Sequence, residues 1–181
     1  MRSKQVASLS STPWEWSQAS NSEKEKWAPC ASFPTVIHQE LLAIGAIPDP
    51  NVGLNELDVQ WVGEQDWQFR TTFVTPADVE SFSGKDLVFD GLDTVATVFL
   101  NGETILESDN MFVAHRVDVS QVMKAAGEEN ILQIRFESPD RVAKERYAAL
   151  HGTRPSLITM GQPSRVYLRK AQYHWGWDWG E

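Results

Sequence analysis

Two β-strands and the turn between them can be recognised in the stretch Val95-Ala96-Thr97-Val98-Phe99-Leu100-Asn101-Gly102-Glu103-Thr104-Ile105-Leu106. The segment from Val95 to Leu100 is apolar and rich in β-branched residues, which favours a buried strand. Asn101-Gly102 is a strong signal for a two-residue type I′ turn, because both residues of that turn need a positive φ angle. The sequence therefore predicts an antiparallel hairpin that continues through Thr104-Ile105-Leu106.

The alternation of apolar and polar residues recurs on both sides of this hairpin. In the longest example, Trp67, Phe69, Thr71 and Phe73 share one face of a predicted strand, with polar side chains opposite. Several short strands separated by Gly, Asn and Asp favour a mainly β fold, an antiparallel β-sandwich. The other predicted strands are Trp14 to Ser17, Leu87 to Phe89, Val113 to Val119, Leu132 to Phe136 and Val166 to Leu168.

Three short helical segments are predicted between the strands. In the first, Ile37, Leu41 and Ile44 recur at the spacing of one helix face. In the third, Pro139 stands at the first helical position, where its missing N–H group has no partner to lose. Each segment starts at a Ser or Thr that would act as N-cap and ends at a Gly: Thr35 to Gly45, Thr75 (with Asp78 as a second cap) to Gly84, and Ser138 to Gly152.

The remaining segments predict loops and a single domain. Residues 1–26 are polar and rich in serine, and we expect a lead-in to one domain at residues 27–181. Residues 47–56 contain two prolines and predict a long loop, in which Asn55 and Glu56 would stabilise turns or face the solvent rather than act in catalysis. The single cysteine, Cys30, excludes an internal disulfide and is expected to be a structural thiol.

Charge and hydropathy exclude several classes of partner. The formal net charge of −9 argues against nucleic acid, because no basic stripe is available to neutralise phosphates. No apolar run approaches the length that spans a membrane. The N-terminus lacks the apolar segment of a signal peptide, so an intracellular (cytoplasmic) location is expected unless the N-terminus of a secreted protein has been trimmed.

The end of the chain gathers aromatic side chains in the segment Tyr173-His174-Trp175-Gly176-Trp177-Asp178-Trp179-Gly180. An exposed cluster of this kind would form a platform for the apolar face of a sugar, with Asp178 accepting hydrogen bonds from hydroxyl groups. Alternatively, the tryptophans fill the core of a final strand or of a domain interface. From the residues of this segment alone, both interpretations stay open.

Motifs for catalysis or cofactor binding are missing from the sequence. It contains no phosphate-binding loop, dinucleotide fingerprint, zinc spacing or nucleophile elbow, and its four histidines are scattered. We therefore expect neither a metal nor an organic cofactor. The residues themselves indicate a β-sandwich with an aromatic end that is suited to sugars and with no visible catalytic machinery.

Three blocks of the sequence carry a resemblance to a known enzyme family. The first runs from Phe33-Pro34-Thr35-Val36-Ile37-His38 through Gly53-Leu54-Asn55-Glu56 to Asp66-Trp67. The second joins Phe89-Asp90-Gly91-Leu92-Asp93-Thr94-Val95-Ala96 to Asn110-Met111-Phe112, and the third runs from Arg169-Lys170-Ala171-Gln172 to Trp177-Asp178-Trp179-Gly180. Together they resemble the opening, the middle and the closing segment of the N-terminal domain in the β-mannosidases of glycoside hydrolase family 2. The third block is the most specific, and the resemblance covers the chain from Trp27 onward.

The resemblance implies a galactose-binding-like jelly-roll domain at the N-terminus of a retaining exo-β-mannosidase, which hydrolyses terminal non-reducing β-D-mannose. Such an enzyme would continue into an immunoglobulin-like domain and a (β/α)₈ barrel with two catalytic glutamates, so we expect no activity from this segment alone. Carried over to this sequence, Asp178 would bind sugar hydroxyls, while Trp177 and Trp179 would shape the pocket wall. The expected partners are β-mannosides, manno-oligosaccharides and the chain's own downstream barrel.

Two other functions remain as alternatives. A free-standing carbohydrate-binding module would use the same aromatic end without catalysis, and the length of the natural open reading frame discriminates it from an enzyme domain. A sister glycosidase (galactosidase, glucuronidase or exo-glucosaminidase) would share the sandwich but recognise another sugar. The position of Asp178 between two tryptophans favours mannose over those sugars.

Overall fold

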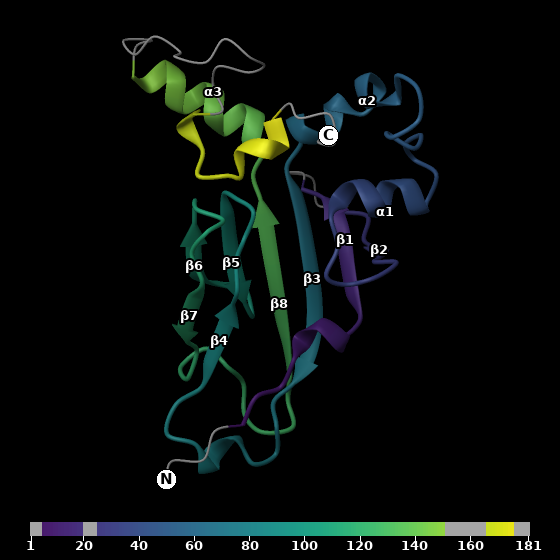
Figure 1. Cartoon of the computed structure of the whole chain (residues 1–181). Coiled ribbons are helices and arrows are strands. Elements are labelled where there is room, and N and C mark those ends of the chain that lie inside the picture. The colour runs from purple at the N-terminus through teal and green to yellow at the C-terminus, as the bar shows by residue number, and fades with distance from the viewer. Residues whose placement is uncertain (1–4, 20–24, 151–165, 176–181) are drawn as a thin grey trace.

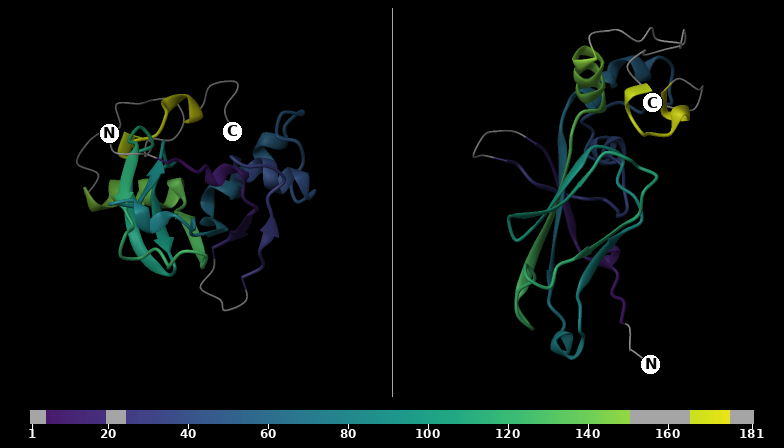
Figure 2. Two further views of the ribbon diagram at one scale, coloured as in Figure 1. Left: turned by 90° about the horizontal axis from the view of Figure 1, so that it is seen from below. Right: turned by 90° about the vertical axis from the view of Figure 1, so that its left-hand side faces the viewer.

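The computed structural model describes residues 5–19, 25–150 and 166–175 (Figure 1). The strands of this part form two antiparallel sheets, a six-stranded sheet with the order β2-β1-β3-β8-β5-β6 and a two-stranded sheet of β4 and β7. The right-hand view of Figure 2 shows the strands in two layers. The strands are β1 (Trp14–Gln18), β2 (Ala28–Pro29), β3 (Trp67–Val74), β4 (Asp86–Phe89), β5 (Ala96–Leu100), β6 (Glu103–Ser108), β7 (His115–Asp118) and β8 (Glu129–Phe136).

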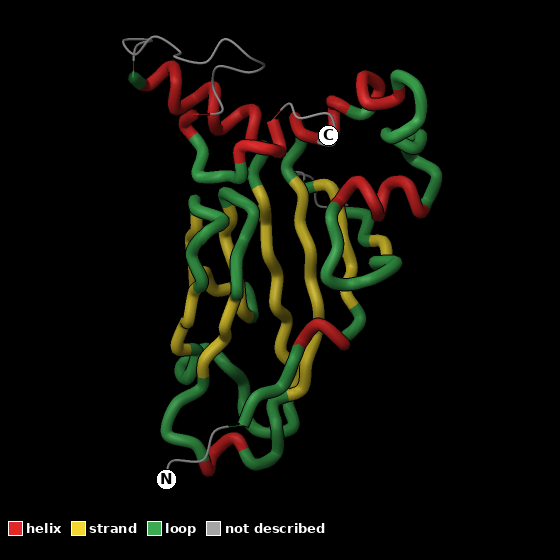
Figure 3. Tube along the Cα trace, in the orientation of Figure 1, coloured by secondary structure: helices red, strands yellow, loops and turns green. Residues whose placement is uncertain are grey.

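Helices gather at the end of the large sheet where β3 begins and β8 ends (Figure 3). The three α-helices there are α1 (Ile37–Ala43), α2 (Asn55–Asp58) and α3 (Pro139–Ala149), and a 3-10 helix, Gln60–Glu64, follows α2. Two further 3-10 helices, Leu9–Ser11 and Val79–Ser81, lie elsewhere in the described chain. Another 3-10 helix, Gln172–Trp175, ends the described chain.

The core lies between the two sheets and follows the alternation of the sequence. Ala96, Val98 and Leu100 of β5 are buried, and they belong to the same apolar cluster as Ile134 of β8 and Leu87 of β4. Fully burying a side chain such as leucine or valine contributes about 1.5–3 kcal/mol. The strands predicted at residues 67–73, 87–89, 95–106, 113–119 and 132–136 are confirmed, with ends that differ by a few residues.

The predicted hairpin is also confirmed. Leu100 pairs with Glu103, and both intervening residues have positive φ angles, 55° for Asn101 and 87° for Gly102. The Asn101 side chain also stabilises this turn. Its amide donates to the backbone oxygen of Val122 and to the side-chain oxygen of Asn130, each at 2.9 Å. Asparagine, which type I′ turns favour for its backbone conformation, therefore also bonds this turn to neighbouring segments through its side chain.

The sheet includes a strand from the predicted lead-in. The strand expected near Trp14 is β1, which pairs with β3 from Trp14 opposite Thr71 to Gln18 opposite Trp67. On its other side β1 pairs with β2. The buried indoles of Trp14 and Trp16 anchor β1 in the core cluster. β1 therefore belongs to the sheet, although it lies within residues 1–26.

Three of the predicted caps are wrong, and in two of them, Thr35 and Thr75, tertiary contacts use the side chain. Helix α1 starts after Val36 without a side-chain cap, and the Thr35 hydroxyl instead donates to the carboxylate of Glu40, a fully buried residue. Thr75 does not cap a helix either. Its buried hydroxyl donates to the carbonyl of Lys124 and accepts from the side-chain amide of Asn130. Asp78 precedes the 3-10 helix Val79–Ser81 without making a side-chain cap.

The predicted loop at residues 47–56 has a short helix at its end, since α2 begins at Asn55. The Asn55 amide donates to the backbone oxygen of Asp49 at 2.8 Å, which is the turn-stabilising role expected of it. Ser138 caps α3 as predicted, because its hydroxyl accepts from the backbone N–H of Arg141 and Pro139 follows it. This helix ends at Ala149, and the predicted end at Gly152 lies outside the described residues.

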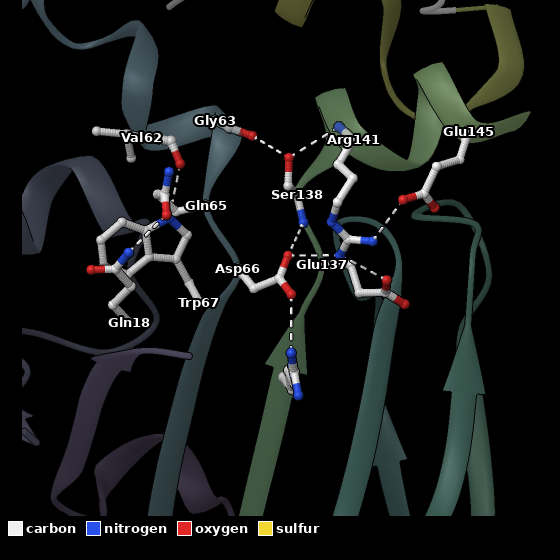
Figure 4. Close-up of polar contacts among 11 residues, drawn as sticks. Gln18, Val62, Gly63, Gln65, Asp66, Trp67, Glu137, Ser138, Arg141 and Glu145 are labelled. Carbon is white, nitrogen blue, oxygen red and sulfur yellow. Dashed lines mark hydrogen bonds and ion pairs between the residues drawn. The ribbon is translucent and has the colours of Figure 1, made fainter. Parts of the chain in front are cut away.

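Helix α3 is attached to the sheet by the carboxylate of Asp66, which lies just before β3 (Figure 4). One oxygen of Asp66 accepts from the Ser138 backbone N–H and from the Arg141 guanidinium, each at 2.8 Å. The other oxygen accepts from the Arg135 guanidinium at 3.0 Å. The Ser138 hydroxyl also donates to the backbone oxygen of Gly63 at 2.7 Å, so that β3, β8 and α3 meet at one point.

This arrangement shifts the acid–base equilibrium of Asp66. Partial burial by itself raises the pKa of the carboxyl, but the hydrogen bonds from Arg141, Ser138 and Arg135 outweigh it, so the pKa lies below its usual value. The hydrogen bond between Asp66 and Arg141 also raises the pKa of Arg141, whose guanidinium pairs with Glu137 as well. The charged form of Asp66 is therefore the one that the folded state stabilises.

We expect Asp66→Asn to lower the free energy of unfolding by about 2 kcal/mol at pH 7, because an amide cannot accept from three donors as a carboxylate does. The folded pKa lies below the unfolded value of about 3.9, so the stabilisation is complete above that value and is lost as the pH falls through the folded pKa. The difference between wild type and variant should therefore shrink below about pH 4. Denaturant unfolding at several pH values measures this.

The matched control is Asp86→Asn, which weakens the exposed ion pair with Arg116 on β4 and β7. It should change the free energy of unfolding by about 0.5 kcal/mol or less. Equal effects of the two substitutions at pH 7 would contradict the role assigned to Asp66.

Candidate functional site

The segment that leads into the predicted aromatic site is attached to the helical end of the molecule (Figure 1, yellow). Leu168 is buried and packs with Val142 and Ala143 of α3 and with Val95. Ala171 is buried as well. Two apolar side chains therefore hold the backbone of residues 166–175 against the sandwich.

The backbone of this segment is bonded to the loop between β6 and β7. Asn110 and Arg169 form an isolated parallel bridge, and the Met111 N–H donates to the Arg169 carbonyl at 3.1 Å. The Ala171 N–H points to the sulfur of Met111 at 3.0 Å. The strand predicted at residues 166–168 is wrong, because Val166 and Tyr167 are in a 3-10 helix and Leu168 is in a bend. Within residues 166–175 only Arg169 makes a β-bridge. The alternating segment Val166 to Leu168 is too short to pair along its length with a neighbouring strand.

An ion pair joins the segment to the loop between β4 and β5. The Lys170 ammonium lies 2.6 Å from Oδ2 of Asp93, and both side chains are more than half buried. Partial burial strengthens such a pair relative to one in open solvent. Gly91, in the same loop, lies so close to the Met111 carbonyl that a Cβ atom would come within 2.9 Å of the carbonyl oxygen. A glycine is therefore required at position 91 for the two loops to approach each other.

His174 completes this charged cluster. Its Nδ1 atom lies 3.8 Å from Oδ2 of Asp93, a distance that permits attraction but no hydrogen bond. Burial lowers the pKa of His174, and the nearby Lys170 ammonium lowers it further against the opposing effect of Asp93. The neutral imidazole is thus favoured. The two opposite charges of the cluster are therefore those of Lys170 and Asp93.

Helix α3 contributes a further set of contacts. The Arg146 guanidinium donates to the Tyr167 carbonyl at 3.1 Å and pairs with Asp109 at 3.1 Å. The rings of Tyr147 and Tyr167 meet edge to face, with centroids 5.7 Å apart. The arginine therefore connects α3, the segment and the loop after β6.

The predicted site residues Asp178, Trp177 and Trp179 lie outside the described residues, and their roles stay predictions. What the structure shows is the anchor that precedes them, which we define as Asp93, Met111, Arg169, Lys170 and His174. These residues come from the second and third sequence blocks that carry the family resemblance. Their meeting in space was not predicted, because the residues from Asp93 to His174 are brought together only by the fold.

Within the described ranges, no group of three or more His, Cys, Asp or Glu side chains is arranged to hold a metal ion. In the same part of the chain, no helix combines the length and the apolar character needed to cross a membrane.

A comparison with known families matches residues 14–181 to the family described as glycosyl hydrolase 2 galactose-binding domain-like. The chain belongs to this family. The predicted fold class, a mainly β antiparallel jelly-roll sandwich of the galactose-binding-like type with a few short helices, is thereby confirmed.

The similar proteins are named as β-mannosidases. The chain is 49% identical over 167 residues to beta-mannosidase B of Thermothelomyces thermophilus and 46% identical over 169 residues to beta-mannosidase B of Aspergillus terreus. The crystal structure of a beta-D-mannosidase from Dictyoglomus thermophilum is 39% identical and superimposes with a TM-score of 0.78 over 93% of this chain. The chain spans about a fifth of each of these proteins, between 19% and 20% of their length.

We expect Asp93→Ala to loosen the anchor, because it removes the carboxylate that pairs with the partly buried Lys170 ammonium at 2.6 Å. Amide hydrogen exchange of Met111 and His174, whose N–H groups donate to the carbonyls of Arg169 and Ala171, should accelerate about tenfold. The amides of β5 should exchange at the wild-type rate.

The matched control is Glu80→Ala, which removes the partner of Lys85, a lysine whose side chain is as buried as that of Lys170 (18% exposed each). Exchange at Met111 and His174 should not respond to it. If Asp93→Ala also leaves both amides at the wild-type rate, the ion pair does not hold the segment.

Proposed function

We propose that the chain is the N-terminal domain of a retaining exo-β-mannosidase that hydrolyses terminal non-reducing β-D-mannose residues. The observation that carries this proposal is the 49% identity to a beta-mannosidase B over 92% of the chain and only 19% of that relative. An identity of this size, spread over the whole domain and confined to a fifth of the relative, is what a domain of a longer enzyme of the same kind would show.

In this proposal the domain supplies substrate-binding groups rather than catalytic ones. The Asp178 carboxylate accepts hydrogen bonds from hydroxyl groups of the terminal mannose, and the indoles of Trp177 and Trp179 form apolar walls of the pocket. Charge-assisted hydrogen bonds that strengthen as the sugar ring distorts lower the barrier to hydrolysis. Two glutamates of a downstream barrel perform the chemistry, which needs no metal or organic cofactor.

The anchor supports this role physically. A binding carboxylate is effective only when its position is held within a fraction of an ångström before the substrate arrives. Lys170 and Arg169 are bonded to two separate loops of the sandwich, and they stand eight and nine residues before Asp178. The rigid sheet is thereby connected to the segment that carries the proposed binding residues.

A second candidate is a free-standing carbohydrate-binding module with the same aromatic end. The relatives, about five times as long as the matched region, favour the enzyme domain over the module. Sequencing the natural open reading frame beyond residue 181 separates the two: several hundred further codons support the enzyme, and an early stop codon supports the module.

Asp178→Ala in the full-length protein should lower kcat/KM for an aryl β-mannoside by about 100-fold or more, because it removes a charge-assisted hydrogen bond that is strongest in the transition state. The melting temperature should stay near the wild-type value. Asp86→Ala, on strand β4, serves as the control and should keep full activity. Activity near the wild-type level in Asp178→Ala would refute the role of this carboxylate.

The 181 residues by themselves should show no turnover of an aryl β-mannoside above the uncatalysed rate, because the two catalytic carboxylates belong to the proposed barrel. A release of the aryl group that rises in proportion to the concentration of the purified domain would contradict the assignment of catalysis to the downstream part.

A further inference from the structure

The outer face of the large sheet carries hydrogen-bonding side chains across four neighbouring strands, β1, β3, β8 and β5 (Figure 1). In each strand the residues that alternate with the core residues point away from the core. The strand registers align these outward residues in two rows that cross the sheet. We call the two rows the polar face: Ser17, Gln68, Arg135 and Thr97 form the first, and Glu15, Arg70, Gln133 and Phe99 form the second.

Two hydrogen-bond donors in the first row have no acceptor. Gln133 donates to Oε1 of Gln68 at 2.8 Å, but the buried Nε2 group of Gln68 makes no hydrogen bond within the part of the chain that the structure describes. The buried Nε group of Arg135, which lies directly opposite Gln68 in the sheet, is unpaired in the same way. A buried donor without a partner costs about 1–3 kcal/mol, so two of them in neighbouring positions favour a site for a ligand that brings oxygen acceptors.

Aromatic rings lie at two points of the second row. The Trp27 indole stacks on the Arg70 guanidinium, which is 4.0 Å from the ring centroid, and Phe99 is two strands away on β5. Both rings are half-buried. Two strand spacings separate Arg70 from Phe99 by about 10 Å, with the Gln133 amide between them. Rings that alternate with hydrogen-bonding groups suit a sugar chain, because each sugar unit has an apolar face and a polar edge.

A recess lies at the β1 end of the polar face. Its volume is about 310 Å³, and its lining includes Ser17 and Gln18 of β1, Glu25 and Lys26 of the following segment, and Trp16. The buried indole N–H of Trp16 also lacks an acceptor among the described residues. Sites for small molecules have volumes of about 300–1,000 Å³, so the recess has room for a sugar unit at the end of a chain.

The charges of this surface are balanced. Arg70 pairs with Glu15 at 2.8 Å, and Arg135 pairs with Asp66 at 3.0 Å. In the recess, residues 25 and 26 bring one charge of each sign. An anionic ligand would therefore gain little over a neutral one, because each of these cations has a carboxylate nearby. A neutral ligand with many hydroxyl groups can donate to the carboxylates and accept from the amides and guanidinium groups.

We propose that the polar face and the recess together bind a neutral oligosaccharide chain that crosses β1, β3, β8 and β5. Hydroxyl groups of the chain bond to Gln133 and Arg135, and apolar sugar faces pack on Trp27 and Phe99. The Arg135 side chain is 39% exposed, so a hydroxyl group that packs against it comes within reach of the unpaired donors. The four strands span about 14 Å, which lets several weak contacts act on one chain.

This surface contains none of the residues proposed for the mannose pocket. Its role is to hold the protein on a polysaccharide while the pocket takes the terminal sugar, which raises the local concentration of chain ends. Only the choice of a mannose polymer as that polysaccharide rests on the proposed function. A protein partner fits less well, because the centre of a protein interface is depleted in charged residues, whereas Arg70 and Arg135 lie in the middle strands of the polar face.

The test is binding of the full-length protein to insoluble β-1,4-mannan, measured by co-sedimentation in the cold. Trp27→Ala and, as a second variant, Gln133→Ala should each raise the dissociation constant about tenfold, because each removes a contact with the sugar chain. The matched controls are Phe82→Ala, at another half-buried aromatic residue, and Gln121→Ala, at an exposed glutamine, and both should bind as the wild type does. Asp178→Ala should also bind normally, because it changes only the proposed pocket.

The outcomes separate this site from the proposed pocket. Weaker binding in the two polar-face variants, at an unchanged melting temperature, supports the site. Wild-type binding by both variants overturns it, and so does wild-type protein that fails to bind mannan or that binds the anionic polymer polygalacturonate equally well. Loss of binding in Asp178→Ala alone assigns mannan to the pocket and overturns the site as well.

Turnover of an aryl β-mannoside is measured on the same proteins. The kcat/KM values of Trp27→Ala and Gln133→Ala should equal the wild-type value, because so small a substrate does not reach the polar face. A fall in kcat/KM that matches the loss of mannan binding overturns the separate site. Mannan binding that depends on Trp27 and Gln133 in a protein without turnover sustains the site and refutes the proposed activity.

Discussion

The antiparallel pairing of β3 with β8 is the contact on which the rest of the structure depends. Eight consecutive residue pairs, from Trp67 opposite Phe136 to Val74 opposite Glu129, form the centre of the large sheet. Strand β1 pairs with the free edge of β3, and β5 pairs with the free edge of β8. A shift of this register by one residue would turn the apolar face of both strands towards solvent, so the pattern of Trp67, Phe69 and Ile134 holds the pairing in place.

The same pairing determines where the helical end of the domain lies. Asp66 precedes β3 and Ser138 follows β8, and the antiparallel arrangement brings them together so that the carboxylate accepts from the Ser138 N–H. Helix α3 starts at this point and lies against Leu168, so its direction sets the path of the segment that ends the described chain. A small set of partly buried polar contacts thus connects the centre of the sheet to α3, which in turn packs against Leu168.

The anchor at this end has the physical character of a holding contact. Its ion pair joins Asp93 and Lys170, whose side chains are both partly buried, which suits a segment that must be held in one position. A domain that supplies binding residues to a site elsewhere in a polypeptide needs such a rigid segment.

The sequence by itself determined every described strand except β2, the type I′ turn at Asn101-Gly102 and the cap at Ser138, because each depends on periodicity or on the backbone preference of nearby residues. Its resemblance to β-mannosidases also identified the family. Only the tertiary structure decided that Thr35 and Thr75 bond to buried groups instead of capping helices, since a hydroxyl takes whichever partner the fold brings near. It likewise decided that residues 166–168 form no strand and that Asp93 meets Lys170, because such contacts join residues far apart in sequence and leave no local pattern.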